Sequence, residues 1–371
     1  MLGNTLGRVF RLTTAGEAFG PALVGIVEGV PAGLPLIEAD LQVDLDRRKP
    51  GQSEIATPRV ESDCIRILSG TLDGVTTGAP IGLVIDNEWA TPERIAAYVD
   101  EKDVIKPGHA TYTYFAKFGV HRDWVADGRA NGRETAMRVA AGAIAKKLLA
   151  PIGVEIVAYS KALGGVCCPE MSFEEIRARA DDPPVRCPDA DAAREMLSRA
   201  LEAKKTGNSL GGIVEAIAHG VPVGWGEPVF GKLDADLARA LMSIGSVKGV
   251  EIGAGFAVAD MTGSENNDLP MLDGDTVRFN TNHAGGILGG ISTGEDIVLR
   301  LAVKPTPTIA LEQETVDMVA RRPATFRCKT ATDPTIVPRM IPIVEAMVAL
   351  VLVDHAMLAE AQDHRKETVN G

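Results

Sequence analysis

Arginines and glycines occur together in two segments whose residue types suit the binding of an anion. The segment 45–59, LDRRKPGQSEIATPR, places Arg48 among three consecutive cationic residues just before a Pro-Gly turn. In the segment 127–145, DGRANGRETAMRVAAGAIA, Arg129 and Arg133 lead into a predicted helix. Guanidinium groups and the backbone N–H groups of a helix N-terminus recognise carboxylates and phosphates. The alternative for the first segment is a solvated basic turn.

One histidine, His109, stands where proton transfer could occur. The segment 105–124, IKPGHATYTYFAKFGVHRDW, places it after a Pro-Gly turn and before alternating Thr and Tyr residues, which predict a strand. Imidazole changes charge near neutral pH and often serves as a general acid or base. A purely structural histidine is the alternative, and the residues alone leave both open.

Glycines near the C-terminal third suit the approach of a flat ring to the backbone. The segment 280–295, NTNHAGGILGGISTGE, is followed closely by the stretch LAVKPTPTIA. In that stretch Lys304, Thr306 and Thr308 offer polar donors. The alternative is a set of tight turns between strands.

Two further segments carry less evident chemistry. The segment 13–33, TTAGEAFGPALVGIVEGVPAG, has the glycines of a substrate loop, yet Ala18 and Phe19 stand at its centre. In CKTATDPTIVPRMIPIVEAM, Asp333 precedes a proline and Arg339 opens a long helix. Asp before Pro at the end of a loop is commonly structural.

Helices are the clearest elements that could position these residues. The segment 133–150 has high helix propensity and ends before Pro151, and 233–243 begins with acidic residues that suit the helix dipole. The segment 339–362 is apolar nearly all round, so we expect it to be buried centrally or at a subunit interface. Pro342 is expected in the first turn of that helix.

Two sequence echoes indicate an internal duplication. GIVEGVPAG at 25–33 returns as GIVEAIAHGVPVG at 212–224, and SGTLDGVTTGAPIGLVI is similar to the later GGILGGISTGEDIVLRLAV. A length of 371 residues suits one large α/β unit or two fused halves. We therefore expect a single domain over 1–371 with pseudo-repeated halves at roughly 1–160 and 200–360. Chance similarity among Gly and Val is the alternative.

Composition excludes several classes of partner. A net charge of −12 argues against a general nucleic-acid surface. The sequence contains no run of about 18 apolar residues, so no membrane span is expected. The start MLGNTLGRVFRLTTAG lacks the apolar stretch of a signal peptide. We expect a cytoplasmic protein with neither nucleic acid nor membrane as a partner.

Taken together, the segments resemble the chorismate synthase family along nearly the whole chain. The motifs that carry the resemblance include GNTLGRVFRLTT, RRKPGQS, PGHATYTY, GRETAMRVAAGAIAKK, VKGVEIGAGF, NHAGGILGGIS and VPRMIPIVEAMVALVL. The resemblance implies a β-α-β sandwich of the α/β (α+β) class with internal duplication, assembled as a homotetramer. It also implies a carbon-oxygen lyase that uses reduced FMN and eliminates phosphate from 5-enolpyruvylshikimate 3-phosphate to give chorismate.

The resemblance also implies roles for individual residues. The expected catalytic residues are His109 and Asp333. The residues expected to bind or line a small anionic cyclic carboxylate substrate are Arg48, Arg129, Arg133, Arg339, Phe19 and Ala331. Those expected to bind the cofactor are Arg129, Ala130, Asn131, Gly245, Ser246, Gly289, Lys304, Thr306 and Thr308.

Several positions depart from the family pattern, which indicates a divergent member. The family's GESHG reads GEAFG here, so Ala18 and Phe19 replace a serine and the histidine that protonates phosphate. GRHDP reads TATDP, which puts Ala331 in place of an arginine, and GHADYT has Thr111 in place of Asp. GRSSARET reads GRANGRET, and NAVKG reads GSVKG. Two alternatives therefore stand beside the family reaction: a paralogue that acts on a different cyclic carboxylate, without the phosphate, and a non-catalytic binding or assembly subunit.

Overall fold

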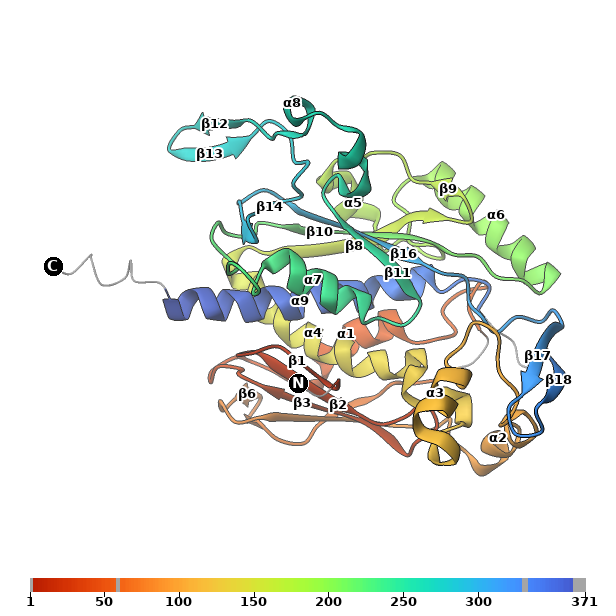
Figure 1. The fold of residues 1–371 in the computed structure, drawn as a ribbon. Helices are drawn as coiled ribbons and strands as arrows, with labels where there is room; N and C mark the ends of the chain where they lie inside the picture. Colours follow the sequence, from red (N-terminus) through yellow and green to blue (C-terminus); the bar gives the residue numbers. More distant parts are fainter. Residues whose placement is uncertain (1–2, 58–60, 329–332, 363–371) are drawn as a thin grey trace.

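The computed structural model describes residues 3–57, 61–328 and 333–362, and within them two five-stranded sheets enclose a layer of helices (Figure 1). The first sheet has the order β1-β2-β3-β7-β4 and the second β11-β16-β10-β8-β9. The strands of the first sheet are β1 (Thr5–Leu6), β2 (Arg11–Ala15), β3 (Ala22–Glu28), β4 (Ile65–Ile67) and β7 (Ile81–Asp86). Those of the second are β8 (Glu155–Leu163), β9 (Val166–Cys167), β10 (Gly212–His219), β11 (Val247–Ile252) and β16 (Ile297–Val303). Neighbouring strands pair antiparallel throughout both sheets, so the expected mixed α/β class is confirmed with antiparallel sheets.

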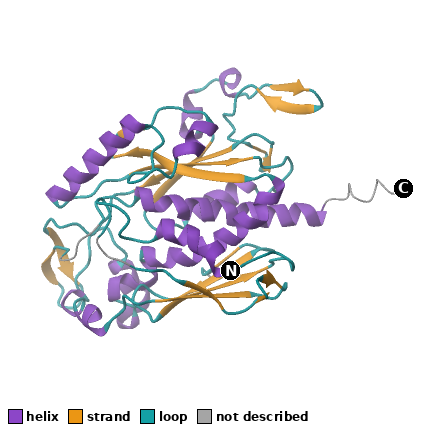
Figure 2. Ribbon diagram, turned by 180° about the vertical axis from the view of Figure 1, so that it is seen from behind, coloured by secondary structure: helices purple, strands orange, loops and turns teal. Residues whose placement is uncertain are grey.

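The helical layer lies between the two sheets, as the view from behind shows (Figure 2). It contains α1 (Glu38–Arg48), α4 (Thr135–Leu149), α7 (Leu233–Met242) and α9 (Val337–Gln362). Two more helices, α5 (Phe173–Arg179) and α6 (Ala190–Thr206), lie beyond the second sheet. Burial along the strands follows this layering: β3 alternates between buried and exposed residues, whereas β10 is a continuous buried run. A strand covered on both faces has no need of polar residues on one face.

Helix α9 is the central core element, as its apolar sequence predicts. By length and composition it could cross a membrane, but 83% of its most apolar window is buried inside the protein. Pro342 lies past the first turn, contrary to expectation, because the helix begins earlier, at Val337. A proline there cannot donate to the carbonyl of Pro338. Instead, Nη1 of Arg186 donates to that carbonyl oxygen at 2.7 Å, so the bond lost from the helix is replaced by a side chain.

The same order of elements occurs twice along the chain. The first echo falls on β3 and β10, which are the central strands of their sheets. The second falls on a short hairpin followed by a long strand beside that central strand, β7 in one sheet and β16 in the other. A long helix follows in each case, α4 and then α9. Strand β8 belongs to the second sheet although the expected first half ends within it, at residue 160.

The remaining elements are short and lie around this sandwich. The strands are β5 (Thr71–Leu72), β6 (Val75–Thr76), β12 (Pro270–Asp273), β13 (Thr276–Phe279), β14 (Ile287–Leu288), β15 (Ile291–Ser292), β17 (Gln313–Asp317) and β18 (Arg322–Phe326). The helices are α2 (Pro92–Ala96), α3 (Thr111–Phe118) and α8 (Gly263–Asn266). Helix α3 corrects the strand predicted after His109: the alternating Thr and Tyr residues form two helical turns of which Thr111 alone is buried.

Candidate active site

One irregular segment, the two short 3-10 turns of Val125–Ala130 and Gly132–Glu134, contacts three of the residues singled out by sequence: Arg48, His109 and Phe19. It leads directly into α4. Ala126, Asp127 and Gly128 have φ values of 50°, 56° and 52°. Side chains other than glycine rarely adopt this left-handed region, so two of these residues store backbone strain. Strain of this kind is commonly found at functional sites.

On one side of this segment lie four buried charges, which we name the arginine cluster: Arg48, Arg133, Glu61 and Asp63. Arg48 and Arg133 are only 2% and 3% exposed. Both guanidinium groups donate to the Asp63 carboxylate, and Arg133 also donates to Glu61. Burial acts to raise the pKa of Asp63, but the charges of Arg48 and Arg133 outweigh it and lower that pKa. Two of the four arginines expected to bind substrate thus already have internal carboxylate partners.

Asp333 and Arg339 adjoin the arginine cluster. Arg339 Nη1 donates to Asp333 Oδ2 at 2.8 Å, and its Nε donates to the carbonyl of Arg48 at 3.4 Å. The backbone N–H of Thr57 donates to Asp333 Oδ1 at 2.7 Å. The expected catalytic carboxylate is therefore ion-paired and held beside α1. Ala331 falls outside the described residues.

On the other side of the segment, the structure brings together His109, Ser246 and Lys304. The backbone N–H of Lys304 donates to the carbonyl of Ser246 at 2.9 Å, and its Nζ donates to the carbonyl of Gly108. His109 Nδ1 lies 2.5 Å from Asp127 Oδ2, although the ring N–H is not directed along that line. These contacts place the end of β16, the start of β11 and the turn before α3 side by side.

The same region has features that fit a cofactor. Thr306 Oγ1 is buried and has no hydrogen-bond partner within the described ranges. A Cβ built at Gly245 would meet no atom within 4 Å, so the backbone there is open to approach. Burial, together with the charge of Lys248, lowers the pKa of Lys304. An unpaired hydroxyl, an open backbone and an ammonium group suit a polar ligand with a flat ring, and the residues present fit reduced FMN.

Three other predicted residues, Arg129, Ala130 and Asn131, follow one another in the segment before α4. Two of them form hydrogen bonds, to β2 and the loop after it or within the segment. Arg129 donates to the carbonyl of Gly16 at 2.9 Å and to Thr14 Oγ1 at 2.8 Å. Ala130 and Asn131 follow it, and Asn131 Oδ1 accepts from the backbone N–H of Arg133 at 3.1 Å. Arg129 thus ties the segment to the first sheet.

Phe19 lies in a small apolar cluster rather than among polar groups. The buried members of this cluster are Ala18, Phe19, Val125 and Ala126. The Phe19 ring also packs edge-on against the ring of Tyr98, with centroids 5.1 Å apart. Trp89, Ala90, Ile95 and Trp124 pack around it. At the position where the resemblance implies an acid, the structure has a hydrophobic anchor.

Gly289 does not join the other predicted residues within the chain. It lies on the turn between β14 and β15, beyond the Ile297 end of β16, whereas Lys304 follows the opposite end of that strand. Thr308 is two residues beyond Thr306 on the segment that leaves β16. No group of His, Cys, Asp or Glu that could hold a metal is found in residues 3–57, 61–328 and 333–362.

Sequence reasoning missed three acidic residues of this site. Glu61 and Asp63 carried no signal except that they follow a cationic loop, and only the fold brings them to Arg133. Asp127 was visible as the first residue of the segment DGRANGRET, but nothing in the sequence paired it with His109, which lies eighteen residues earlier. Buried cations require carboxylate partners. Several arginines in a segment expected to be buried are therefore the signal that could have indicated nearby acidic residues.

Comparison with known proteins agrees with this architecture. The family model described as Chorismate synthase matches residues 10–357. Chorismate synthases of Methanosarcina mazei and Methanocella arvoryzae are each 52% identical, over 96% and 95% of this chain and 97% and 94% of their own lengths. That of Acetivibrio thermocellus is 46% identical over 97% of this chain and 96% of its own length. A crystal structure of chorismate synthase superimposes with a TM-score of 0.75, at 32% identity, over 96% of this chain and 93% of that one. The chain belongs to the chorismate synthase family.

Proposed function

We propose that the protein is a chorismate synthase, a carbon-oxygen lyase of the shikimate pathway. The reaction eliminates phosphate from 5-enolpyruvylshikimate 3-phosphate and yields chorismate. The observation that carries the proposal is the match over nearly the full length of chain and relatives, at about half of all positions. The convergence of the arginine cluster and His109 on one segment before α4, with the Asp333–Arg339 pair beside the cluster, supports it.

The residues of the site divide the work by charge. Arg48, Arg133 and Arg339 would hold the anionic groups of the substrate, with Glu61 and Asp63 keeping the unliganded guanidinium groups neutralised. His109 would exchange a proton through Nε2, the ring nitrogen that faces away from Asp127.

Reduced FMN is the cofactor that we propose for this chain. Ser246, Lys304 and Thr306 would hold it together with the open backbone at Gly245. When bound, reduced FMN supplies electron density that assists departure of the phosphate, with no net redox change. Arg129, Ala130 and Asn131 would border it through the segment that leads into α4.

An anaerobic assay tests the proposal. The purified protein would be mixed with reduced FMN and 5-enolpyruvylshikimate 3-phosphate while phosphate, chorismate and flavin absorbance are recorded. Release of phosphate and chorismate in equal amounts is the expected result. Flavin binding without phosphate release would contradict the proposed reaction and favour a paralogue with another substrate. Absence of both would favour an assembly role.

One observation favours the paralogue as the second candidate. Phe19 fills the cluster with Val125 and Ala126, where it offers no proton to a leaving group. Asp123 lies nearby, and burial together with the charges of Glu17 and Asp127 raises its pKa. An apolar anchor beside several carboxylates suits a cyclic carboxylate without the phosphate better than a phosphate dianion.

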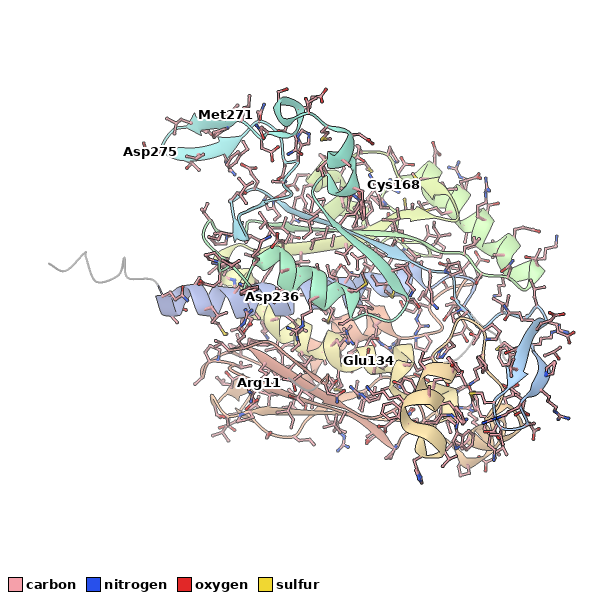
Figure 3. All side chains as sticks on the ribbon, in the orientation of Figure 1. Arg11, Glu134, Cys168, Asp236, Met271 and Asp275 are labelled. Carbon is pink, nitrogen blue, oxygen red and sulfur yellow. The ribbon has the colours of Figure 1, made fainter. Side chains whose placement is uncertain are left out.

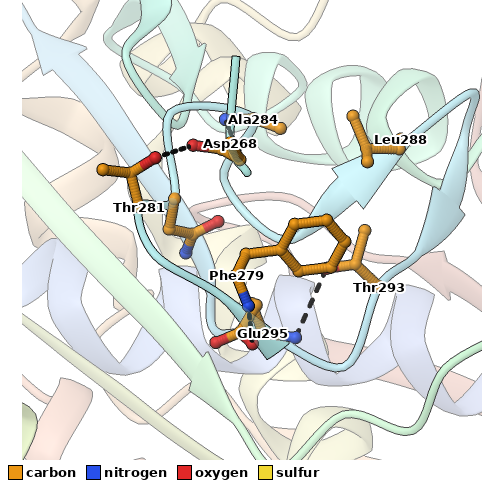
Figure 4. Close-up of a pocket in the computed structure, with 8 residues that line it drawn as sticks. Asp268, Phe279, Thr281, Ala284, Leu288, Thr293 and Glu295 are labelled. Carbon is orange, nitrogen blue, oxygen red and sulfur yellow. Dashed lines mark hydrogen bonds between the residues drawn. The ribbon is translucent and has the colours of Figure 1, made fainter. Parts of the chain in front are cut away.

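We also propose assembly into a homotetramer, with the hairpin β12–β13 as one of the contacts. The hairpin projects from the body, with Asp275 at its tip and Met271 along β12 (Figure 3), and its strands are exposed almost throughout. Its base is anchored: Asp268 accepts from Thr281 Oγ1 at 2.6 Å (Figure 4). A two-stranded hairpin is marginal in water unless a surface covers it. A second copy of the chain is the proposed cover.

Analytical ultracentrifugation tests the assembly. Leu272→Glu, at an apolar side chain 77% exposed on the hairpin, should lower the sedimenting mass. Asp275→Ser, at the adjoining turn, is the control and should leave it unchanged. A wild-type protein that sediments as a monomer would contradict the proposal.

We also propose a cytoplasmic location, on the basis of the same enzyme assignment.

A further inference from the structure

Asp127 is the one carboxylate of the site that contacts the expected proton-transfer residue. Its side chain is fully buried, and its Oδ2 lies 2.5 Å from His109 Nδ1. Thr111 Oγ1 donates to the same oxygen at 2.9 Å. A histidine whose Nδ1 faces a fixed carboxylate keeps its proton on that nitrogen and presents Nε2 as the free acceptor.

The backbone at Asp127 indicates that this placement is specific. Its φ of 56° is a conformation that a residue with a side chain adopts at an energetic disadvantage. Glycine tolerates that backbone freely, and asparagine and aspartate tolerate it better than other residues that have a side chain. The strain is maintained while the carboxylate points into the protein toward His109 and Thr111, rather than to solvent.

The electrostatic surroundings keep this carboxylate charged. Burial acts to raise the pKa of Asp127, but the close contact of His109, the charges of Lys106 and His109 and the hydroxyl of Thr111 together lower it. Lys106 is itself buried and lies on the same turn as His109. A charged Asp127 thus faces one histidine, one lysine and one hydroxyl.

We infer that Asp127 is the positioning residue for His109, which it orients and holds in the Nδ1–H tautomer so that Nε2 is available for proton transfer. This inference rests on the proposed function for the role of His109 in catalysis, but the tautomer itself does not depend on any substrate. The ring N–H does not point along the line to Oδ2 in the ligand-free protein, and catalytic contacts of this kind often tighten when ligands bind.

Ring-nitrogen NMR of isotope-labelled histidine in the ligand-free protein tests the inference. The chain has six histidines, and the signals of His109 would be assigned with His109→Gln. At about pH 8, where an ordinary imidazole is neutral, wild-type His109 should be in the Nδ1–H form. In Asp127→Asn it should shift toward the Nε2–H form common in free imidazole. Wild-type His109 in the Nε2–H form, or a tautomer unchanged by Asp127→Asn, would overturn the inference.

Control variants separate this role from folding. Asp123→Asn removes a carboxylate of the same stretch that accepts from the backbone of Val125 instead, and it should leave His109 unchanged. Asp127→Gly relieves the left-handed strain, so it should fold. Thr111 Oγ1 lies 2.9 Å from Asp127 Oδ2, so Thr111→Asp in that background places a carboxylate close to the position of the lost one and should restore the Nδ1–H form. An Nε2–H form in this double variant would count against a carboxylate as the group that fixes the tautomer.

Kinetics supply a separate readout. In Asp127→Asn, kcat should fall by about 10- to 100-fold, as is typical when the partner of a functional histidine is lost, with KM little changed. If the wild-type protein does not convert the substrate but its His109 responds to Asp127→Asn as expected, the proposed function fails and the positioning role stands. If kcat falls while the tautomer is unchanged, the positioning role fails and the proposed function stands.

Discussion

Gly142 of α4 lies so close to Ala346 of α9 that a Cβ at position 142 would come within 2.3 Å of the Ala346 Cβ. This close approach joins two helices of the helical layer, α4 and α9. A methyl group there must push the helices apart. We expect Gly142→Ala to destabilise the protein by about 1–3 kcal/mol through overpacking, despite the better helix propensity of alanine. Urea unfolding measures it, and Gly263→Ala, where no atom lies within 4 Å, is the control. Equal stability of the two variants would contradict this packing.

The bond from Arg186 to the Pro338 carbonyl gives a second prediction. Arg186→Met should lower the free energy of unfolding by about 1.5–3 kcal/mol, because a hydrogen bond from a charged donor is lost inside the protein. In a Pro342→Ala background the effect should shrink, since the restored N–H can donate to the same carbonyl. A double-mutant cycle from urea titrations provides the coupling energy. Strict additivity would rule out the compensation.

Glu345 of α9 should make the free energy of unfolding depend on pH in the acidic range. It is buried and accepts from Arg47 at 2.7 Å and from Lys146 at 2.7 Å. Burial opposes its charge, but these two cations lower its pKa from 4.5 to about 2. Because the folded pKa is the lower one, the stabilisation is full above pH 4.5 and is lost as the pH falls toward 2. Wild type should therefore lose stability over that window more steeply than Glu345→Gln, measured by urea unfolding at a series of pH values. Parallel curves would exclude the effect.

Substitution in the arginine cluster should lower the free energy of unfolding far more than substitution in a surface ion pair. Removing one partner of a buried ion pair costs about 3–5 kcal/mol, whereas an exposed pair contributes about 0–1 kcal/mol. Arg133→Met therefore should destabilise strongly, and Arg11→Met, which breaks the exposed pair with Glu28, should not. Thermal and urea unfolding of both variants test this. Similar losses in the two would contradict the assignment of the cluster as buried charge.

Restoring the polar groups of the family pattern at three positions should favour the phosphorylated substrate. The triple variant Ala18→Ser, Phe19→His and Ala331→Arg introduces a hydroxyl, an imidazole and a guanidinium group. A charge-assisted contact contributes about 1.5–3 kcal/mol, so binding should tighten about 10- to 100-fold. Calorimetric titration with 5-enolpyruvylshikimate 3-phosphate measures it, with Phe19→Leu as the apolar control. Unchanged affinity of the triple variant would count against the phosphate-pocket argument.

The sequence predicted three helices well, did not predict α1 or α6, and predicted the local form around His109 poorly. Helices α4, α7 and α9 begin and end within two residues of their expected bounds, since propensity and apolar pattern act locally. Helix α3 was expected as a strand because alternating Thr and Tyr suit either form when only one residue is buried. At this segment a tertiary contact accompanies the helical form: Thr111 donates to Asp127, which lies sixteen residues later.

The candidate site shows the same division. Arg48, Arg133, His109 and Lys304 were identified by residue type and resemblance. Their partners could not be, because charge pairing between distant segments is set by the fold. Whether the changes at Ala18 and Phe19 alter the reaction stays a prediction, since overall identity averages over all positions.

The bridge between Arg186 and the Pro338 carbonyl also has an evolutionary consequence. The proline at position 342 is harmless only while a donor at position 186 reaches the carbonyl that the proline cannot. The two positions, far apart in sequence, should therefore change together among relatives. Lineages that lose the arginine should be those in which the proline has already gone, and loss of the arginine before the proline should be rare.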